Sequence, residues 1–305
     1  MYITVIGAGA TGGYFGARLA ASGLPVTFLV RPNRATQMKA DGLVVKSVLG
    51  DLVIRDPQIA LDTKDIPHCD LVVLCLKNYQ LEACFPQLKD LVRKGARILP
   101  ILNGVEHFES LAKEFGKESV IAGNCKINAT LDSHGTILHT NKLHKLIFGE
   151  IIPTQIDFCL TLQQILSKAN LEIVYSQTIW EEIWSKYAFI TVFSGVTTAG
   201  NLTTDLIYQN EATRQMFRRA LDEMTRLAGV CGVNLPDNFV SSQVESLAKY
   251  PKGTTTSMHQ DLKKGLPLEV ESLQGAAIRL ATKKNLELPI IETLYGLIKP
   301  YELGL

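Results

Sequence analysis

The first thirteen residues constrain the fold of this chain more than any other stretch. An apolar run with β-branched residues, 1–6, predicts a buried strand, and it leads directly into Gly7-Ala8-Gly9-Ala10-Thr11-Gly12. In a dinucleotide-binding turn, Gly7 allows the tight exit from the strand, Gly9 lets a pyrophosphate approach the backbone, and Gly12 lets the next helix pack closely. The amides and dipole at the N-terminus of that helix then face the anion. Because the motif stands between a predicted strand and an amphipathic helix, we expect all six residues to bind a dinucleotide, and prefer this to a plain glycine turn.

The residue after the second strand indicates which dinucleotide is bound. Residues 25–30 predict that strand, and Arg31 follows it, 24 residues beyond Gly7, with no acidic residue before Asp41. A site for NAD usually has Asp or Glu here, which binds the ribose 2′-hydroxyl and would repel a 2′-phosphate. The guanidinium of an arginine suits a phosphate, although a solvated surface arginine is the alternative. We therefore expect NADPH as the cofactor.

Polar residues follow two further apolar runs, 70–76 and 97–102, which predict parallel strands covered by helices on both faces. Ligands of an open parallel sheet bind beyond the carboxyl ends of its strands. Lys77, Gln80 and Asn103 are therefore candidate contacts to cofactor or substrate, and loop polarity or helix capping is the alternative for each. Residues 43–55 predict an inserted hairpin, and 120–123, 135–139 and 146–149 predict shorter strands that close the same sheet. Residues 171–175 predict a last strand.

The pattern changes from strands to long helices at about residue 178. We expect an α/β protein: a Rossmann-type NADP-binding domain with a doubly wound sheet over residues 1–176, and an all-helical substrate and catalytic domain over 177–305. The absence of a Pro/Gly/Ser-rich linker predicts a tight interface with the site between the domains. The apolar helical stretch 207–230 fits either a core or a homodimer interface, and periodicity does not choose between them.

Composition excludes several classes of function. The net charge of +1 gives no general attraction to nucleic acid or to a membrane surface, and no apolar run reaches the roughly 18 residues of a spanning helix. The six cysteines show no CxxC spacing and lie mostly in apolar runs, and the N-terminal strand leaves no room for a signal peptide. We expect a cytoplasmic protein. The six histidines show no metal-binding spacing, so no metal is expected.

Two polar features stand out in the helical half. Lys186 lies within a strongly apolar helical stretch, 179–190, where it must reach solvent, an acidic partner or a ligand. Hydroxyl and amide side chains gather in 254–262, and Glu269 lies near the start of the next helix. Snorkelling of the lysine and ordinary helix capping are the alternatives.

Taken together, these motifs resemble the ketopantoate reductases, or 2-dehydropantoate 2-reductases, over residues 1 to about 295. The shared features, in order and with similar spacing, are Gly7-x-Gly9-x-x-Gly12, Arg31, Leu76-Lys77-x-x-Gln80, Leu102-Asn103-Gly104-Val105, Trp184-x-Lys186, Ser257-Met258-x-Gln260-Asp261 and Glu269-x-x-x-x-x-Gly275. The resemblance implies a two-domain enzyme that uses NADPH to reduce 2-dehydropantoate, a small 2-oxo acid, to pantoate on the route to pantothenate and coenzyme A.

The resemblance also implies roles for individual residues. Lys186 matches the family's catalytic lysine, and Glu269 matches the glutamate that binds substrate near it. Ser257 matches a serine that contacts the substrate carboxylate, and Asn103 an asparagine between cofactor and substrate. Lys77 and Gln80 match residues that line the cofactor side. A lysine ammonium is protonated at neutral pH, so it can donate a proton to the ketone oxygen as hydride arrives at carbon.

The chain differs from the family pattern at positions that would face the substrate. The family usually carries asparagines four and eight residues after the lysine, where this chain has Ile190 and Ser194, and Thr254 stands where an asparagine is common. We keep Ser194 as a candidate substrate contact, but Ile190 cannot hydrogen-bond a polar acid. Two alternatives therefore stay open: a related reductase of a bulkier or less polar 2-oxo acid, and a non-catalytic NADP-binding regulatory protein. The presence of both Lys186 and Glu269 argues against the second.

Overall fold

The computed structural model describes residues 1–304 and divides into two compact units. Unit 1 consists of 1–102 and 107–179, and unit 2 consists of 103–106 together with the chain from Trp180 onward. The sequence led us to expect one division after residue 176. It gave no sign that the short segment 103–106 would join the helical unit.

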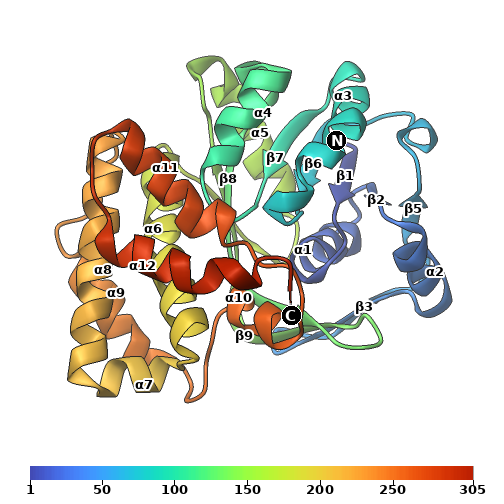
Figure 1. Ribbon diagram of the computed structural model, residues 1–305. Helices are drawn as coiled ribbons and strands as arrows, with labels where there is room; N and C mark the ends of the chain where they lie inside the picture. Colours follow the sequence, from blue (N-terminus) through green and yellow to red (C-terminus); the bar gives the residue numbers. More distant parts are fainter. Residues whose placement is uncertain (305) are drawn as a thin grey trace. The chain divides into compact units, whose positions relative to one another are not determined.

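The first sheet of unit 1 has five parallel strands in the order β5-β2-β1-β6-β7 (Figure 1). The chain moves outward from β1 to β2, and later resumes on the other side of β1 with β6. This reversal of strand order places a topological switch point between β1 and β6, where ligands of such sheets bind. The strands are β1 (Ile3–Ile6), β2 (Val26–Leu29), β5 (Gln58–Ala60), β6 (Leu71–Leu74) and β7 (Arg97–Pro100).

The side chains of each central strand pack into two hydrophobic cores, one on each face of the sheet. Ile3 and Val5 of β1 belong to one core, whereas Ile6 belongs to the other. A strand buried on both faces needs helices on both sides, which is the arrangement that the continuous apolar runs predicted. The doubly wound parallel sheet is therefore confirmed. The helices beside the two sheets are α1 (Ala10–Ala21), α2 (Pro32–Asp41), α3 (Phe85–Arg93), α4 (Glu106–Phe115) and α5 (Ile156–Leu166).

The later strands of unit 1 form a second sheet, whereas we expected them to close the first one. One parallel bridge, between Ile98 of β7 and Val120 just before β8, does join the segment 120–123 to the first sheet. The order of the second sheet is β10-β9-β3-β4, and β8 pairs antiparallel with β9. The segments 135–139 and 146–149 lie largely in one long strand, β9, whose middle interrupts the apolar pattern at the place where the pairing with β8 has an irregularity in register. The predicted hairpin in 43–55 is confirmed, but it lies in this sheet. The strands are β3 (Leu43–Ser47), β4 (Leu52–Ile54), β8 (Ala122–Leu131), β9 (Ile137–Gly149) and β10 (Glu172–Tyr175).

Unit 2 is helical, as the sequence predicted, and no strand occurs between residues 180 and 304. The helix from Ile179 to Gly200 is buried at every residue from 191 to 198, so it forms the core of this unit. The helices are α6 (Ile179–Gly200), α7 (Thr204–Gln209), α8 (Glu211–Val230), α9 (Phe239–Ser246), α10 (Ser257–Lys263), α11 (Ala276–Lys283) and α12 (Pro289–Ile298). None of the helices described is long and apolar enough to cross a membrane.

A buried carboxylate on α8 caps the start of α12. Glu223 is 3% exposed, and it accepts hydrogen bonds from the backbone amides of Ile290 (3.0 Å) and Ile291 (3.1 Å). The first amides of a helix have no partner within it, and the residue before this helix, Leu288, carries no group that could supply one. The negative charge also suits the positive end of the helix dipole. Glu223 therefore fixes α12 against α8.

We predict that Glu223→Gln lowers the free energy of unfolding by about 1–3 kcal/mol, since the amide removes the charge and one of the two acceptor oxygens. Urea unfolding, followed by circular dichroism, measures the change. Glu245→Gln on α9 is the matched control, because Glu245 is exposed. Equal stability of the two variants would contradict this account of the cap.

Candidate functional site

The glycine-rich turn of unit 1 has the geometry that its sequence predicts. Gly7 adopts φ +91°, and a Cβ there would lie 2.4 Å from the carbonyl oxygen of Cys75. At Gly12 a Cβ would lie 2.3 Å from the carbonyl oxygen of Gly7 and 2.7 Å from the Cβ of Cys75. Neither position tolerates a side chain, because backbone would have to move. Gly9, the N-cap of α1, has no heavy atom within 4 Å of its ideal Cβ. The protein itself therefore leaves space above this glycine.

Lys77 and Gln80 lie at the same edge of the sheet as the glycine turn. The amide of Cys75, just after β6, donates to the carbonyl of Ile6, the last residue of β1 (2.8 Å). Two residues on, Lys77 caps the 3₁₀ turn η2 (Asn78–Gln80), and its amide donates to Oε1 of Gln80 at 3.4 Å. Both side chains are half-buried. The switch point thus gathers the turn and both of these candidate cofactor contacts.

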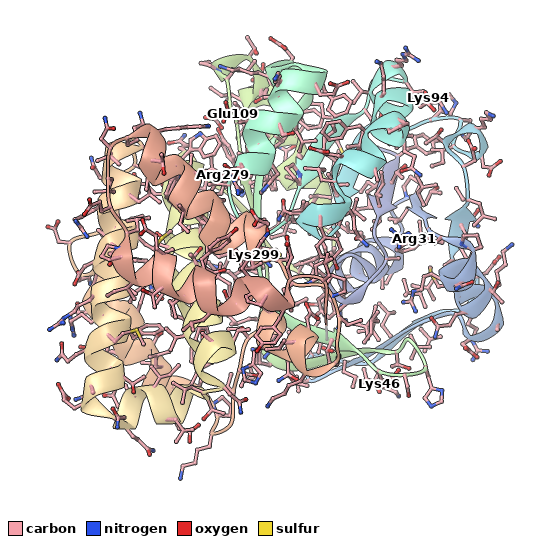
Figure 2. The ribbon with its side chains drawn as sticks, in the orientation of Figure 1. Arg31, Lys46, Lys94, Glu109, Arg279 and Lys299 are labelled. Carbon is pink, nitrogen blue, oxygen red and sulfur yellow. The ribbon has the colours of Figure 1, made fainter. Side chains whose placement is uncertain are left out.

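Arg31 is the N-cap of α2 and is exposed; Figure 2 labels it. A second arginine, Arg34, was not among the predicted site residues. Its Nε donates to the carbonyl oxygen of Ala8 (3.0 Å) inside the glycine turn, and its Nη1 donates to the carbonyl oxygen of Gly135 (2.9 Å). Burial lowers the pKa of the Arg34 guanidinium. The one available signal was the helix start at Pro32, which puts Arg34 in the first helical turn.

The charges around the turn favour an anion. The first turns of α1 and α2 carry no acidic residue, and α1 points its N-terminal amides toward the turn. Arg31 and Arg34 add positive charge on the α2 side. A negatively charged group would therefore be stabilised at this edge of the sheet.

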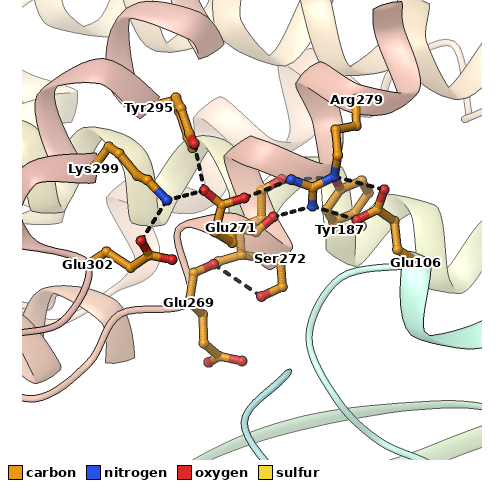
Figure 3. A network of polar contacts seen from close by, with 10 residues as sticks. Glu106, Tyr187, Glu269, Glu271, Ser272, Arg279, Tyr295, Lys299 and Glu302 are labelled. Carbon is orange, nitrogen blue, oxygen red and sulfur yellow. Dashed lines mark hydrogen bonds and ion pairs between the residues drawn. The ribbon is translucent and has the colours of Figure 1, made fainter. Parts of the chain in front are cut away.

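In unit 2, Glu269 and Asn103 come together although 166 residues separate them. The amide Nδ2 of Asn103 donates to Oε2 of Glu269 at 3.4 Å, and Glu269 is only 4% exposed. Gly104 follows with φ +86°, and a Cβ there would lie 2.6 Å from the carbonyl oxygen of Ser272. Only glycine allows the backbone to approach so closely in this conformation. Figure 3 shows Glu269 and Ser272 beside a polar network, with the side chain of Glu269 pointing away from it.

A π-helical turn, η7 (Glu271–Gly275), follows Glu269 directly and packs against α6. The hydroxyl of Tyr187 donates to the carbonyl oxygen of Leu273 (2.9 Å), and Nε2 of Gln274 donates to the carbonyl oxygen of Thr191 (2.6 Å). Burial raises the pKa of Tyr187, so the hydroxyl stays a neutral donor. Tyr187 adjoins Lys186, which is half-buried. The turn of α6 that carries Lys186 therefore lies beside the segment that carries Glu269.

The remaining predicted substrate contacts lie in different environments. Ser194 is buried, and its hydroxyl accepts a hydrogen bond from Nε2 of Gln274 at 3.3 Å. Ser257 is the exposed first residue of α10. Ile190 lies one helical turn after Lys186 on α6 and is half-buried. Gln274, a fully buried amide on η7, was missed, and no sequence signal pointed to it.

Within residues 1–304, no group of three or more His, Cys, Asp or Glu side chains could hold a metal ion.

Family models match both halves of the chain. The model described as ketopantoate reductase PanE/ApbA matches residues 3–152, and the one described as ketopantoate reductase PanE/ApbA C terminal matches residues 178–302. Among curated relatives, the uncharacterized oxidoreductase YkpB of Bacillus subtilis is 32% identical over 302 residues, which is 99% of each chain. The 2-dehydropantoate 2-reductase of Nostoc sp. is 28% identical and covers 97% of this chain and 93% of its own length.

Solved structures show the same fold. The crystal structure of 2-dehydropantoate 2-reductase from Geobacter metallireducens superposes with a TM-score of 0.92 at 25% identity, covering 98% of this chain and 99% of that one. A D-mandelate dehydrogenase solved with NADH and anilino(oxo)acetate superposes with a TM-score of 0.89 at 23% identity, covering 99% of this chain and 98% of its own. At that identity the second likeness concerns the fold alone.

We predict that the same substitution has a large effect on stability at one glycine of the turn and almost none at another. Gly12→Ala should lower the free energy of unfolding by about 1–3 kcal/mol, because its Cβ meets backbone. Gly9→Ala should change it by less than about 0.5 kcal/mol, because the site is open and the φ of −79° suits alanine. Urea unfolding measures both variants. An equally stable Gly12→Ala variant would contradict the close packing of α1 on the turn.

Proposed function

The chain belongs to the ketopantoate reductase PanE/ApbA family, and from that premise we propose that it reduces 2-dehydropantoate to pantoate with NADPH. As a member of this family it is an oxidoreductase. The choice of NADPH, the choice of substrate and the roles of the residues below are the proposal. The observation that carries it is the buried Glu269 beside Asn103 on the segment packed against the helical turn of Lys186.

The turn of unit 1 fits a dinucleotide phosphate. Gly9 leaves open space above the N-terminus of α1, and Gly7 and Gly12 are fixed as glycines by close backbone contacts. At the end of β2, where an acidic residue would bind the 2′-hydroxyl of NAD, the chain has Val30 and Arg31. In the proposal Arg31 binds the 2′-phosphate, and the side chains of Lys77 and Gln80 line the same site.

The helical unit supplies the groups that handle the substrate. A bound NADPH would supply the hydride that reaches the carbonyl carbon. The negative charge that develops on the carbonyl oxygen is stabilised by the ammonium of Lys186, which donates its proton there and recovers one from water. Glu269 accepts a hydrogen bond from the substrate hydroxyl. Asn103 holds the Glu269 carboxylate, and its proposed role is to contact the substrate.

One observation favours a different 2-oxo acid as the substrate. Ile190 is half-buried one turn after Lys186, where the family pattern has an asparagine, and Ser194 is buried and bonded to Gln274. An isoleucine at this place makes the surroundings of the substrate more apolar, which suits a bulkier or less polar side chain. The D-mandelate dehydrogenase crystallised with anilino(oxo)acetate shares the fold. Other 2-oxo acids are therefore the second candidates.

We predict that the protein oxidises NADPH when ketopantoate is added, and that Lys186→Ala lowers kcat by about 10²–10⁴-fold through loss of the proton donor. The absorbance of the reduced nicotinamide gives the rate. Lys249→Ala, which removes an exposed lysine of the same unit, is the control and should retain the wild-type rate. Equal kcat in wild type and Lys186→Ala would contradict the proposed role of this lysine.

A panel of 2-oxo acids separates the two candidate substrates. If wild type binds NADPH but turns ketopantoate over poorly, the second candidate is favoured, and Ile190→Asn should raise kcat/KM for ketopantoate while lowering it for the preferred bulkier acid. If the ratio of kcat/KM for ketopantoate to kcat/KM for the bulkier acid is the same in wild type and in Ile190→Asn, Ile190 does not determine the choice of substrate.

A further inference from the structure

The segment Asn103–Glu106 needs an external anchor, because Asn103 contacts Glu269 from a short stretch between β7 and α4. Gly104 lets its backbone approach Ser272 on η7 closely, but a glycine adds no side chain that could hold the segment. Glu106 ends the segment three residues after Asn103. Whatever holds the Glu106 carboxylate therefore limits where the Asn103 amide can lie.

Arg279 on α11 holds this carboxylate with two parallel hydrogen bonds. Its Nε donates to Oε1 of Glu106 at 3.2 Å, and its Nη2 donates to Oε2 of Glu106 at 2.6 Å. The planar guanidinium matches a carboxylate in this paired geometry, whereas a lysine ammonium does not. Figure 3 shows the guanidinium between the carboxylates of Glu106 and Glu271.

The same guanidinium holds the other side of the Asn103–Glu269 pair. Nη1 of Arg279 donates to Oε2 of Glu271 at 2.7 Å, and Nη2 donates to the backbone carbonyl of Glu271 at 2.8 Å. Glu271 is two residues after Glu269 and begins the π-helical turn. Arg279 therefore binds Glu106, which is close in sequence to Asn103, and Glu271, which is close in sequence to Glu269.

Glu271 is itself secured from α12. Its Oε1 accepts hydrogen bonds from the hydroxyl of Tyr295 at 2.6 Å and from the ammonium of Lys299, which also pairs with Glu302. Burial raises the pKa of the Glu271 carboxyl, but the hydrogen bonds from Lys299, Tyr295 and Arg279 outweigh this effect and bring it to about 2. Glu271 therefore stays ionised, and able to hold Arg279, throughout the neutral range.

The network is too exposed for stability alone to account for it. The side chain of Arg279 is 46% exposed, that of Glu106 31% and that of Glu271 36%. Ion pairs at such exposure contribute little to folding. Four directed hydrogen bonds from one rigid group do, however, fix relative position.

We propose that Arg279 is a positioning residue, which sets the separation of the Asn103 amide and the Glu269 carboxylate through Glu106 and Glu271. The consequence for catalysis rests on the proposed function, whereas the consequence for geometry does not. Because displacement of a substrate-positioning group by about 1 Å can cost about 10²-fold in rate, loss of this bridge affects turnover more than folding.

The test compares Arg279→Met with Lys283→Met. Both variants remove one cation of α11 and leave an apolar stem, but only the first releases Glu106 and Glu271, because Lys283 is exposed in the last turn of that helix. We expect Arg279→Met to lower kcat for the preferred 2-oxo acid by about 10- to 100-fold with an unchanged Kd for NADPH. Lys283→Met should retain kcat within about twofold, and Arg279→Lys should recover only part of the loss because it cannot hold both carboxylates in the paired geometry.

Crystal structures of wild type and of Arg279→Met provide a readout that needs no activity. We expect the distance from Nδ2 of Asn103 to Oε2 of Glu269, 3.4 Å here, to exceed hydrogen-bonding range in the variant. An unchanged distance would overturn the proposal, and so would an equal loss of kcat in Lys283→Met. If no 2-oxo acid is reduced by wild type, the proposed function fails while the crystallographic comparison still decides the role of Arg279.

Discussion

The burial of one carboxylate, Glu269, is the constraint on which the proposed reaction centre depends. A charged group with so little exposure is costly unless donors surround it, and one donor comes from Asn103, far away in the sequence. The contact requires the backbone of 103–106 to lie against the π-helical turn. Gly104 makes this approach possible, and its positive φ and its distance from Ser272 exclude any other residue there without strain. The backbone conformation of Gly104 therefore makes possible the hydrogen bond between Asn103 and Glu269.

Close backbone packing also requires glycines in the turn of unit 1, but there the packing leaves an open place for a ligand. Gly7 and Gly12 are needed because strand, turn and helix approach each other within van der Waals contact, and Cys75 of the neighbouring chain segment fills the remaining space. Gly9 is needed for no internal contact. Arg34 then ties the turn to the strand connection at Gly135 through the Ala8 carbonyl. The fold thus prepares a rigid, positively charged edge with an open place above the helix N-terminus.

Features set by neighbouring residues, such as the glycine turn and the buried strands, could be predicted from the sequence. Contacts between residues far apart in the sequence could not. The glycine spacing and the continuous apolar strands predict the switch point, because turn geometry and two-sided burial leave direct traces in the sequence. The apolar pattern did not reveal the length of β9, because it is interrupted in the middle of the strand, where the pairing with β8 is irregular. The contact of Asn103 with Glu269 has no local trace in the sequence. Asn103 stands out because it follows a predicted strand and Glu269 because it lies near a helix start, and the family resemblance relates both to the substrate. Neither the i→i+5 bonding of η7 nor the bridge made by Arg279 has a sequence signature that one chain can reveal.

Glu269→Gln tests the central claim most directly, since it keeps the size of the side chain and removes its charge. We would measure the Kd for NADPH and kcat/KM for the preferred 2-oxo acid, with Glu292→Gln on the exposed face of α12 as the control. The account predicts a fall in kcat/KM of about 10²-fold or more, with an unchanged Kd for NADPH and a control at the wild-type level. Wild-type kcat/KM in Glu269→Gln would contradict it.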